Sequence, residues 1–220
     1  MDVGEYVQRE RDPWGLKRIG IDERRASLLR AHLSRKGAVL DVGCAFGIYT
    51  RFLASLGNRS VGVDMSERMV SEAKRRCPSC RVVKADATHL PFRDETFDAV
   101  LLMGTLIYID RKAQALQEIR RVMKKNAVLC IIDRNRHSPW HALIAAVRRE
   151  TAIDKREDFL ASKQLTALLR DAGFRLRTMS GDLVALPVLS QSRVTRRLFW
   201  FLGERMPLAA AFLVAIAEKS

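Results

Sequence analysis

The chain is predicted to fold as one α/β domain, in which helices cover both faces of a doubly wound sheet of seven strands. Three observations predict this class. Short apolar runs suited to buried strands alternate with amphipathic stretches suited to helices. No repeat or low-complexity linker interrupts the alternation. At 220 residues, the chain is long enough for one α/β domain with a full core and short for two.

The predicted elements follow one another regularly along the chain. Strands are predicted at 39–42, 60–63, 81–86, Phe97–Met103, 127–132, 174–179 and 212–217. Helical spacing of apolar residues predicts the intervening helices. They are marked by Phe52, Leu53 and Leu56; by Met69, Val70 and Ala73 after a Ser66 cap; by Leu116, Ile119, Val122 and Met123; by Leu165, Leu168, Leu169 and Ala172 before Gly173; and by Leu198, Phe199, Phe201 and Leu202.

The most informative segment joins the first strand to the first helix after it. Residues 39–42 read as a buried strand, and the turn Gly43-Cys44-Ala45-Phe46-Gly47 then leads into an amphipathic helix. A strand that ends in such a turn and opens a helix is a nucleotide-binding device. Asp64 ends the next strand, 21 residues beyond Gly43, where a carboxylate can accept the two hydroxyls of a ribose.

The spacing of small residues in this turn argues against a nicotinamide cofactor. A dinucleotide fingerprint needs small residues at the first, third and sixth positions of the turn. Here the small residues are Gly43, Ala45 and Gly47, and the sixth position is Ile48. A nicotinamide-dependent oxidoreductase is therefore disfavoured.

The same turn resembles motif I of the class I S-adenosylmethionine-dependent methyltransferases, Asp-x-Gly-x-Gly-x-Gly, with Ala45 in place of the middle glycine. The resemblance covers about residues 36–135 and 164–219. Further phrases typical of the family are Ala85-Asp86-Ala87 with Leu90-Pro91-Phe92, Phe97-Asp98-Ala99-Val100 and Glu118 to Lys124. Lys124-Lys125-Asn126 replaces the usual Lys-Pro-Gly-Gly turn. The family fold implies a Rossmann-like sheet of order 3-2-1-4-5-7-6 with an antiparallel seventh strand.

The resemblance also implies a cofactor, S-adenosylmethionine, with S-adenosylhomocysteine as its product. Asp64 would accept the ribose hydroxyls, Asp86 the adenine amino group, and Asp41 would hold the amino-acid end. The expected cofactor-binding residues are Asp41, Gly43, Cys44, Ala45, Gly47, Asp64, Met65, Asp86, Ala87, Met103 and Gly104. For Asp64 and Asp86, the alternative is a strand-end carboxylate that caps the following turn.

Methyl transfer from a sulfonium is an in-line displacement, so alignment of the acceptor matters more than side-chain chemistry. A base is needed only if the acceptor is protonated at working pH. His137 and Tyr108 are the candidate catalytic side chains, and His137 also has the simpler reading of an exposed loop residue. The candidate acceptor-binding residues are Tyr6, Trp14, Tyr49 and Trp140; Tyr49 has either the ligand or the core as its expected neighbour.

The formal net charge of +14 suggests nucleic acid, anionic lipid or an acidic substrate as partner, but the Lys and Arg residues are scattered. Leu102-Met103-Gly104-Thr105 replaces the Asn/Asp-Pro-Pro-Tyr phrase of many enzymes that methylate nucleic-acid bases. A small-molecule acceptor, apolar or lipid-like, is therefore favoured. The alternatives are an RNA or protein methyltransferase and an inactive methyltransferase-like binding partner. The helix that carries Arg193, Arg196 and Arg197 is expected to pack on the sheet, with peripheral membrane contact as its alternative.

The chain is expected to divide into three parts: an amino-terminal helical cap (1–36), a cofactor-binding half (37–135) and a substrate-side part (136–220).

Cys77 and Cys80 are expected to be two loop thiols, because no second pair completes a zinc site. Asp133-Arg134-Asn135 lacks the adjacent Asp-Asn of metal-dependent relatives, so no metal is expected. No signal peptide is visible, and the charge-free run at 206–217 has only 12 residues, which is too short to cross a bilayer. A cytoplasmic protein is therefore predicted, and the oligomeric state stays open.

Overall fold

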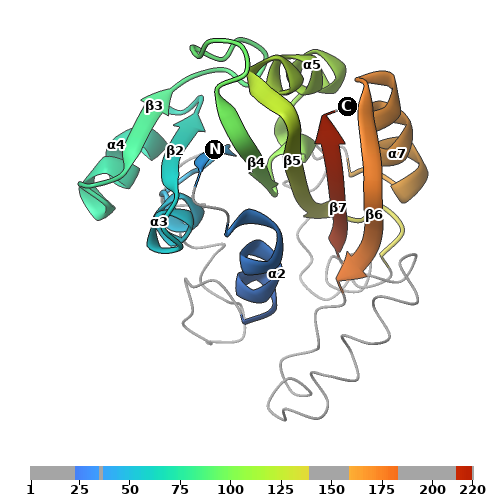
Figure 1. Cartoon of the computed structure of the whole chain (residues 1–220), viewed down its shortest axis with the longest axis horizontal. Coiled ribbons are helices and arrows are strands. Elements are labelled where there is room, and N and C mark those ends of the chain that lie inside the picture. The colour runs from blue at the N-terminus through green and yellow to red at the C-terminus, as the bar shows by residue number, and fades with distance from the viewer. Residues whose placement is uncertain (1–22, 35–36, 139–158, 183–211, 220) are drawn as a thin grey trace, which may run out of the picture.

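The computed structural model describes residues 23–34, 37–138, 159–182 and 212–219. They form a seven-stranded sheet of order β3-β2-β1-β4-β5-β7-β6 (Figure 1). β7 runs antiparallel to both β5 and β6, and the remaining neighbours are parallel. The predicted fold class, strand order and antiparallel seventh strand are therefore confirmed.

The strands and helices alternate as predicted. The strands are β1 (Ala38–Val42), β2 (Arg59–Asp64), β3 (Arg81–Lys84), β4 (Phe97–Met103), β5 (Met123–Arg134), β6 (Phe174–Asp182) and β7 (Phe212–Lys219). The helices are α2 (Glu23–Leu33), α3 (Ile48–Ser55), α4 (Glu67–Arg76), the short 3-10 helix η1 (Leu106–Tyr108), α5 (Lys112–Val122) and α7 (Ser162–Asp171). The Leu198–Leu202 helix lies outside the described residues.

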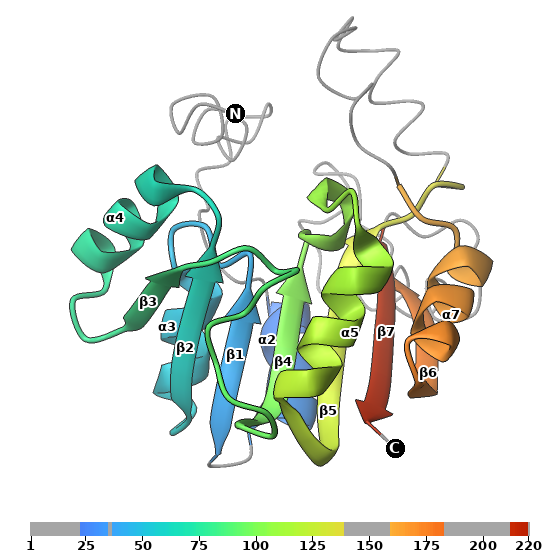
Figure 2. The same ribbon diagram turned by 90° about the horizontal axis from the view of Figure 1, so that it is seen from above.

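Two apolar layers hold the helices on the sheet. On one face, Leu29 and Leu33 of α2 and Leu53 of α3 pack against β1, β4, β5 and β7. On the other face, α5 and α7 pack through Leu116, Ile119, Leu165 and Leu169, and Figure 2 shows the two helix layers with the sheet between them. β1, β4 and β5 are covered on both faces, which explains their nearly continuous apolar sequences.

Several strand boundaries differ from the prediction. β3 ends at Lys84 because the backbone N–H of Thr88 binds the Asp86 carboxylate and the chain turns out of the sheet there. β5 begins at Met123, which was expected on the preceding helix. The polar residues 124–126, including Asn126 at φ +60°, interrupt the apolar run. The apolar pattern therefore predicts a strand that begins only at residue 127.

Cys77 and Cys80 form a disulfide at the end of α4, with Cα atoms 5.3 Å apart. The expectation of two separate loop thiols is therefore wrong. The short turn between them brings Cys77, which is buried, next to Cys80 at the edge of the α4–β3 core. Cys44 and Cys130 are free and buried.

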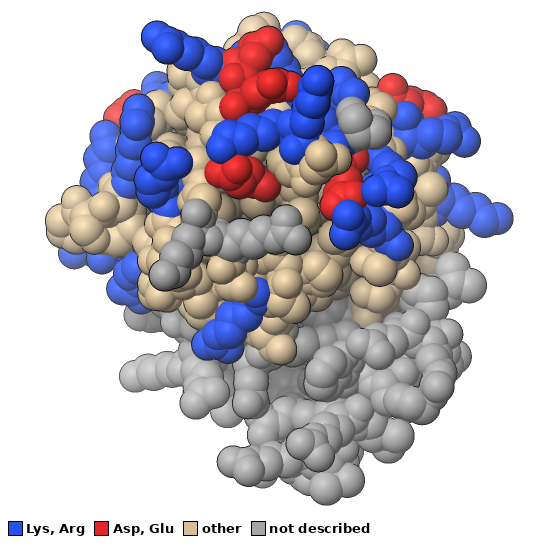
Figure 3. Space-filling model, in the orientation of Figure 1, with Lys and Arg blue, Asp and Glu red and all other residues tan. Residues whose placement is uncertain are grey.

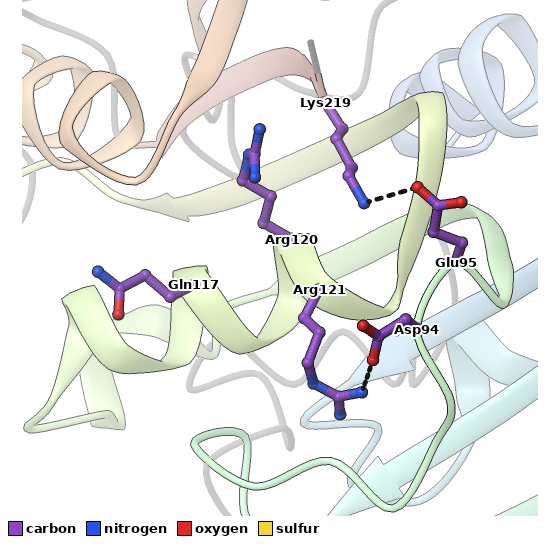
Figure 4. Close-up of a pocket in the computed structure, with 6 residues that line it drawn as sticks. All are labelled: Asp94, Glu95, Gln117, Arg120, Arg121 and Lys219. Carbon is purple, nitrogen blue, oxygen red and sulfur yellow. Dashed lines mark hydrogen bonds and ion pairs between the residues drawn. The ribbon is translucent and has the colours of Figure 1, made fainter.

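A polar cavity of about 530 Å³ lies where β4 begins and β7 ends, the opposite edge of the sheet from the carboxyl ends of the parallel strands. Figure 4 shows Arg121 directed at Asp94 and Lys219 at Glu95 across this cavity. Lys219 also donates to the carbonyl oxygen of Met123 at 2.7 Å. These bonds join the β3–β4 loop, α5, β5 and β7, so the cavity is a solvent-exposed polar junction away from the motif I turn. No helix among the described residues is long and apolar enough to cross a membrane.

Candidate functional site

The turn after β1 forms a tight left-handed arch held by the next strand. Gly43, Ala45 and Gly47 have φ of +73°, +44° and +73°. The N–H groups of Gly43 and Cys44 both donate to the carbonyl oxygen of Val63, at 2.8 and 2.9 Å. The arch therefore sits at the carboxyl edge of the sheet, between β1 and β2, where α/β proteins bind ligands.

Packing within the fold requires a glycine at position 43. A Cβ at this position would come within 2.3 Å of the Thr105 side chain, which lies on the loop after β4. Thr105 in turn donates its hydroxyl to the carbonyl oxygen of Val42 at 3.0 Å. The glycine thus allows the β4 loop to cross directly over the end of β1. The sequence pattern signals the glycine, but only the fold reveals Thr105 as its reason.

The Asp64 carboxylate joins the arch to the end of β2. Its Oδ2 accepts the N–H of Ala45 at 2.9 Å, and its Oδ1 accepts the N–H of Ser66 at 2.9 Å. Ser66 then caps α4 by accepting the N–H of Met69, as predicted. An ionised carboxylate offers about four acceptor positions, so two bonds leave capacity for two ribose hydroxyls. The turn-capping and ligand-binding readings of Asp64 are compatible.

Asp41 is enclosed beneath the arch. Its Oδ2 accepts the hydroxyl of Thr50 on α3 at 2.6 Å, and the residue is 1% exposed. Burial raises the pKa of Asp41 to about 7, although the bonds from Thr50 lower it. The carboxyl group thus couples β1 to α3 from below the arch. Burial likewise raises the pKa of the neighbouring Cys44 thiol.

Asp86 lies two residues beyond β3, the strand next to β2, in a turn of its own. Its Oδ1 accepts the N–H of Thr88 at 2.8 Å, and this bond holds the pKa of Asp86 below its usual range. The carboxylate is therefore ionised at neutral pH and suited to accept an amino group. Ala87, half-buried, packs against the main core beside it.

The loop after β4 forms the other wall of the site. Gly104 has φ +64°, and a Cβ placed on it would meet no atom of the described residues within 4 Å, so this backbone borders open space among them. Met103, beside it, is half-buried and packs on the α2–α3 core. Tyr108 on η1 is 47% exposed, and Met65 after Asp64 is 70% exposed. They are the exposed large apolar side chains among the described residues, and both lie on loops at this edge.

The other sequence candidates divide between core, surface and undescribed positions. Tyr49 packs against the α2–α3 core, which is the second of its two expected neighbours. His137 is exposed and its backbone N–H donates to Asn135. Tyr6, Trp14 and Trp140 lie outside the described residues. Sequence reasoning missed Asp133, a buried carboxyl at the end of β5, because it was considered only as a metal ligand.

Figure 3 shows Lys and Arg on the visible face interspersed with acidic groups, without one continuous basic stripe. Within the described residues, no three His, Cys, Asp or Glu side chains are grouped as metal ligands would be.

Comparison with known proteins assigns the family. The sequence model of the methyltransferase domain matches residues 40–131. A demethylmenaquinone methyltransferase of Beutenbergia cavernae is 31% identical over 192 residues, which cover 76% of this chain and 80% of that protein. The chain belongs to the class I S-adenosylmethionine-dependent methyltransferases.

Two further proteins share most of their length with the chain. An uncharacterised Methanocaldococcus jannaschii protein is 26% identical over 175 residues, which cover 80% of this chain and 82% of its own. The crystal structure of a Thermotoga maritima S-adenosylmethionine-dependent methyltransferase superposes with a TM-score of 0.66 at 25% identity. It covers 89% of this chain and 87% of its own. These similarities extend the assignment beyond the motif I region.

The positive φ of Ala45 leads to a first prediction. A non-glycine residue in the left-handed region costs about 1–2 kcal/mol. Replacement by glycine removes this cost, but part of the gain is offset because glycine loses more conformational entropy on folding. We expect Ala45→Gly to raise the free energy of unfolding by roughly 0.5–1 kcal/mol. Urea denaturation measures the change. The same substitution at Ala54, an exposed helical position on α3, serves as the control and should lower stability by a similar amount. An equal loss of unfolding free energy in both variants would contradict backbone strain at Ala45.

Asp41 leads to a second prediction. Its carboxyl binds a proton more tightly in the folded state, with a pKa of about 7, than in the unfolded chain. The free energy of unfolding should therefore fall as pH rises from about 4 to about 7, by at most about 1.4 kcal/mol per pH unit from this group. In Asp41→Asn, the slope should be shallower. Urea denaturation of both proteins at several pH values tests this, and parallel curves would contradict it.

Proposed function

We propose that the protein transfers the methyl group of S-adenosylmethionine to a small apolar acceptor of quinone type. The main observation that supports this proposal is the open backbone at Gly104, with the exposed apolar side chains of Tyr108 and Met65 at the same edge. Such a surface at a ligand edge suits an apolar acceptor. The similarity to a demethylmenaquinone methyltransferase supports the same acceptor class.

The described residues fit the cofactor in four respects. The arch and Gly104 leave room where the methionine portion would lie, and Asp64 retains acceptor capacity for the ribose. Asp86 is an ionised acceptor that would suit the adenine amino group. Met65 is exposed next to Asp64, where its flexible thioether side chain would cover the adenine ring.

The chemistry then depends on alignment. The bound sulfonium supplies an activated methyl group. The chain would hold the acceptor on the Tyr108 side of the site and exclude water, and correct alignment is worth effective molarities on the order of 10⁵–10⁸ M. If the acceptor atom carries a proton, Tyr108 and His137 remain the candidate groups to receive it.

Binding of S-adenosylhomocysteine tests the cofactor assignment. We expect Asp64→Ala to weaken binding at least tenfold, roughly 1.4 kcal/mol, because the ribose loses its acceptor and Ala45 its anchor. Isothermal titration calorimetry measures the affinity. Ser66→Ala is the matched control: it should lower stability by about 1 kcal/mol through the lost cap and leave affinity unchanged. Absence of binding to the wild-type protein would overturn the cofactor assignment.

Transfer of a tritiated methyl group tests the acceptor class. Demethylmenaquinone with a short isoprenoid chain is the probe, and total RNA is the competing acceptor. We expect label in the organic extract, dependent on Asp64. Label in RNA or in protein would overturn the quinone-type proposal while keeping the methyltransferase assignment.

A further inference from the structure

The loop between β3 and β4 carries Asp86 in a closed turn. The Oδ1 of Asp86 accepts the N–H of Thr88 at 2.8 Å, and its carbonyl oxygen accepts the N–H of His89 at 2.9 Å. Ala85, just before the turn, donates its N–H to the carbonyl oxygen of Asp64 at 3.1 Å. The turn is thus a compact unit, and β2 anchors the chain that enters it.

A pair of charged side chains on α5 anchors the chain that leaves the turn. Leu90 follows the turn directly and is buried, and its N–H donates to Oε1 of Glu118 at 2.8 Å. Its carbonyl oxygen accepts a bond from Nη2 of Arg121 at 3.1 Å. Two side chains, 28 and 31 residues away along the chain, therefore bind both backbone polar groups of one loop residue.

Arg121 uses the whole guanidinium fork in this anchor. Its Nε and Nη2 donate to the two carboxylate oxygens of Glu118 at 2.9 and 2.7 Å, which is a bidentate pair. Its Nη1 donates to the carbonyl oxygen of Phe92 at 2.9 Å and to Oδ1 of Asp94 at 2.6 Å. The bonds from Arg121 hold the pKa of Glu118 below its usual range, so the pair is charged at neutral pH. A lysine ammonium could not reproduce this planar arrangement.

We propose that Glu118 and Arg121 are positioning residues for the adenine end of the cofactor, because they fix Leu90 and thereby the place of the Asp86 turn. This role rests on the proposed function, which assigns Asp86 to the adenine amino group. Arg121 lines the polar cavity at the opposite edge (Figure 4), so it would act through the loop and not by contact with a ligand. An acceptor that is held in place before the ligand arrives loses less entropy on binding.

The ratio of the affinities for two ligands, measured by isothermal titration calorimetry, tests the proposal. The ligands are S-adenosylhomocysteine and its 6-deamino analogue, in which hydrogen replaces the adenine amino group. We expect the wild-type protein to bind the first at least about tenfold more tightly, because only the first donates to a charged acceptor. Arg121→Lys keeps the positive charge but loses the planar fork, and it should lower this ratio to below about threefold.

Arg120→Lys is the matched control at the next position of α5. Arg120 donates its Nε to the carbonyl oxygen of Gly173, which lies outside the β3–β4 loop, so this variant should keep the wild-type ratio. The ratio separates positioning from a general loss of structure, because partial unfolding weakens the binding of both ligands equally.

The outcomes distinguish this proposal from the cofactor assignment. If the wild-type protein discriminates between the two ligands and Arg121→Lys discriminates equally, the positioning role alone is overturned. A wild-type protein that binds both ligands with equal affinity also overturns it, because the amino group is then not recognised. Absence of S-adenosylhomocysteine binding to the wild-type protein overturns the cofactor assignment, and the positioning role with it.

Hydrogen exchange of the ligand-free protein, followed by NMR, tests the anchor directly. We expect the Leu90 N–H to exchange about tenfold or more slowly in the wild-type protein and in Arg120→Lys than in Arg121→Lys, because the charged pair holds it. Exchange of this N–H in the wild-type protein at the rate of an unstructured chain overturns the proposal, even if Arg121→Lys does not fold.

Discussion

The site depends on the bond between the Asp64 carboxylate and the Ala45 N–H. Without it, the left-handed arch would be tied to β2 only through the Val63 carbonyl oxygen. The same carboxylate holds Ser66, which caps α4. One side chain therefore determines the shape of the arch, the beginning of α4 and the acceptor capacity available to a ribose. A ligand that bonds to Asp64 meets a group already oriented, which reduces the entropy lost on binding.

The arch at this edge of the sheet is held rigidly. Gly43 and Thr105 interlock so closely that even a Cβ would be excluded, and the bond between Asp41 and Thr50 joins β1 to α3 beneath the arch. The geometry of the arch is therefore fixed by backbone bonds and close packing.

Two buried acids with raised pKa values, Asp41 and Asp133, share this edge. Each binds a proton more tightly in the folded state, so both make the fold more stable at mildly acid pH than at neutral pH. At the opposite edge, Arg121 bonds to both Glu118 and Asp94, and Lys219 pairs with Glu95. The two acids whose pKa is raised by burial thus lie at the edge proposed to bind ligands, as expected of functional sites.

The sequence by itself determined the fold class, the strand order and the position of the arch. Apolar periodicity and glycine spacing are local signals, and the family phrases placed Gly43, Asp64 and Asp86 at strand ends. Tertiary structure alone decided that Thr105 requires Gly43, that Tyr49 faces the core, that Cys77 and Cys80 are joined and that Asp133 is buried. Most of these are contacts between segments far apart in the chain. Even the Cys77–Cys80 bond depends on how the chain turns between α4 and β3, so no spacing in the sequence encodes them.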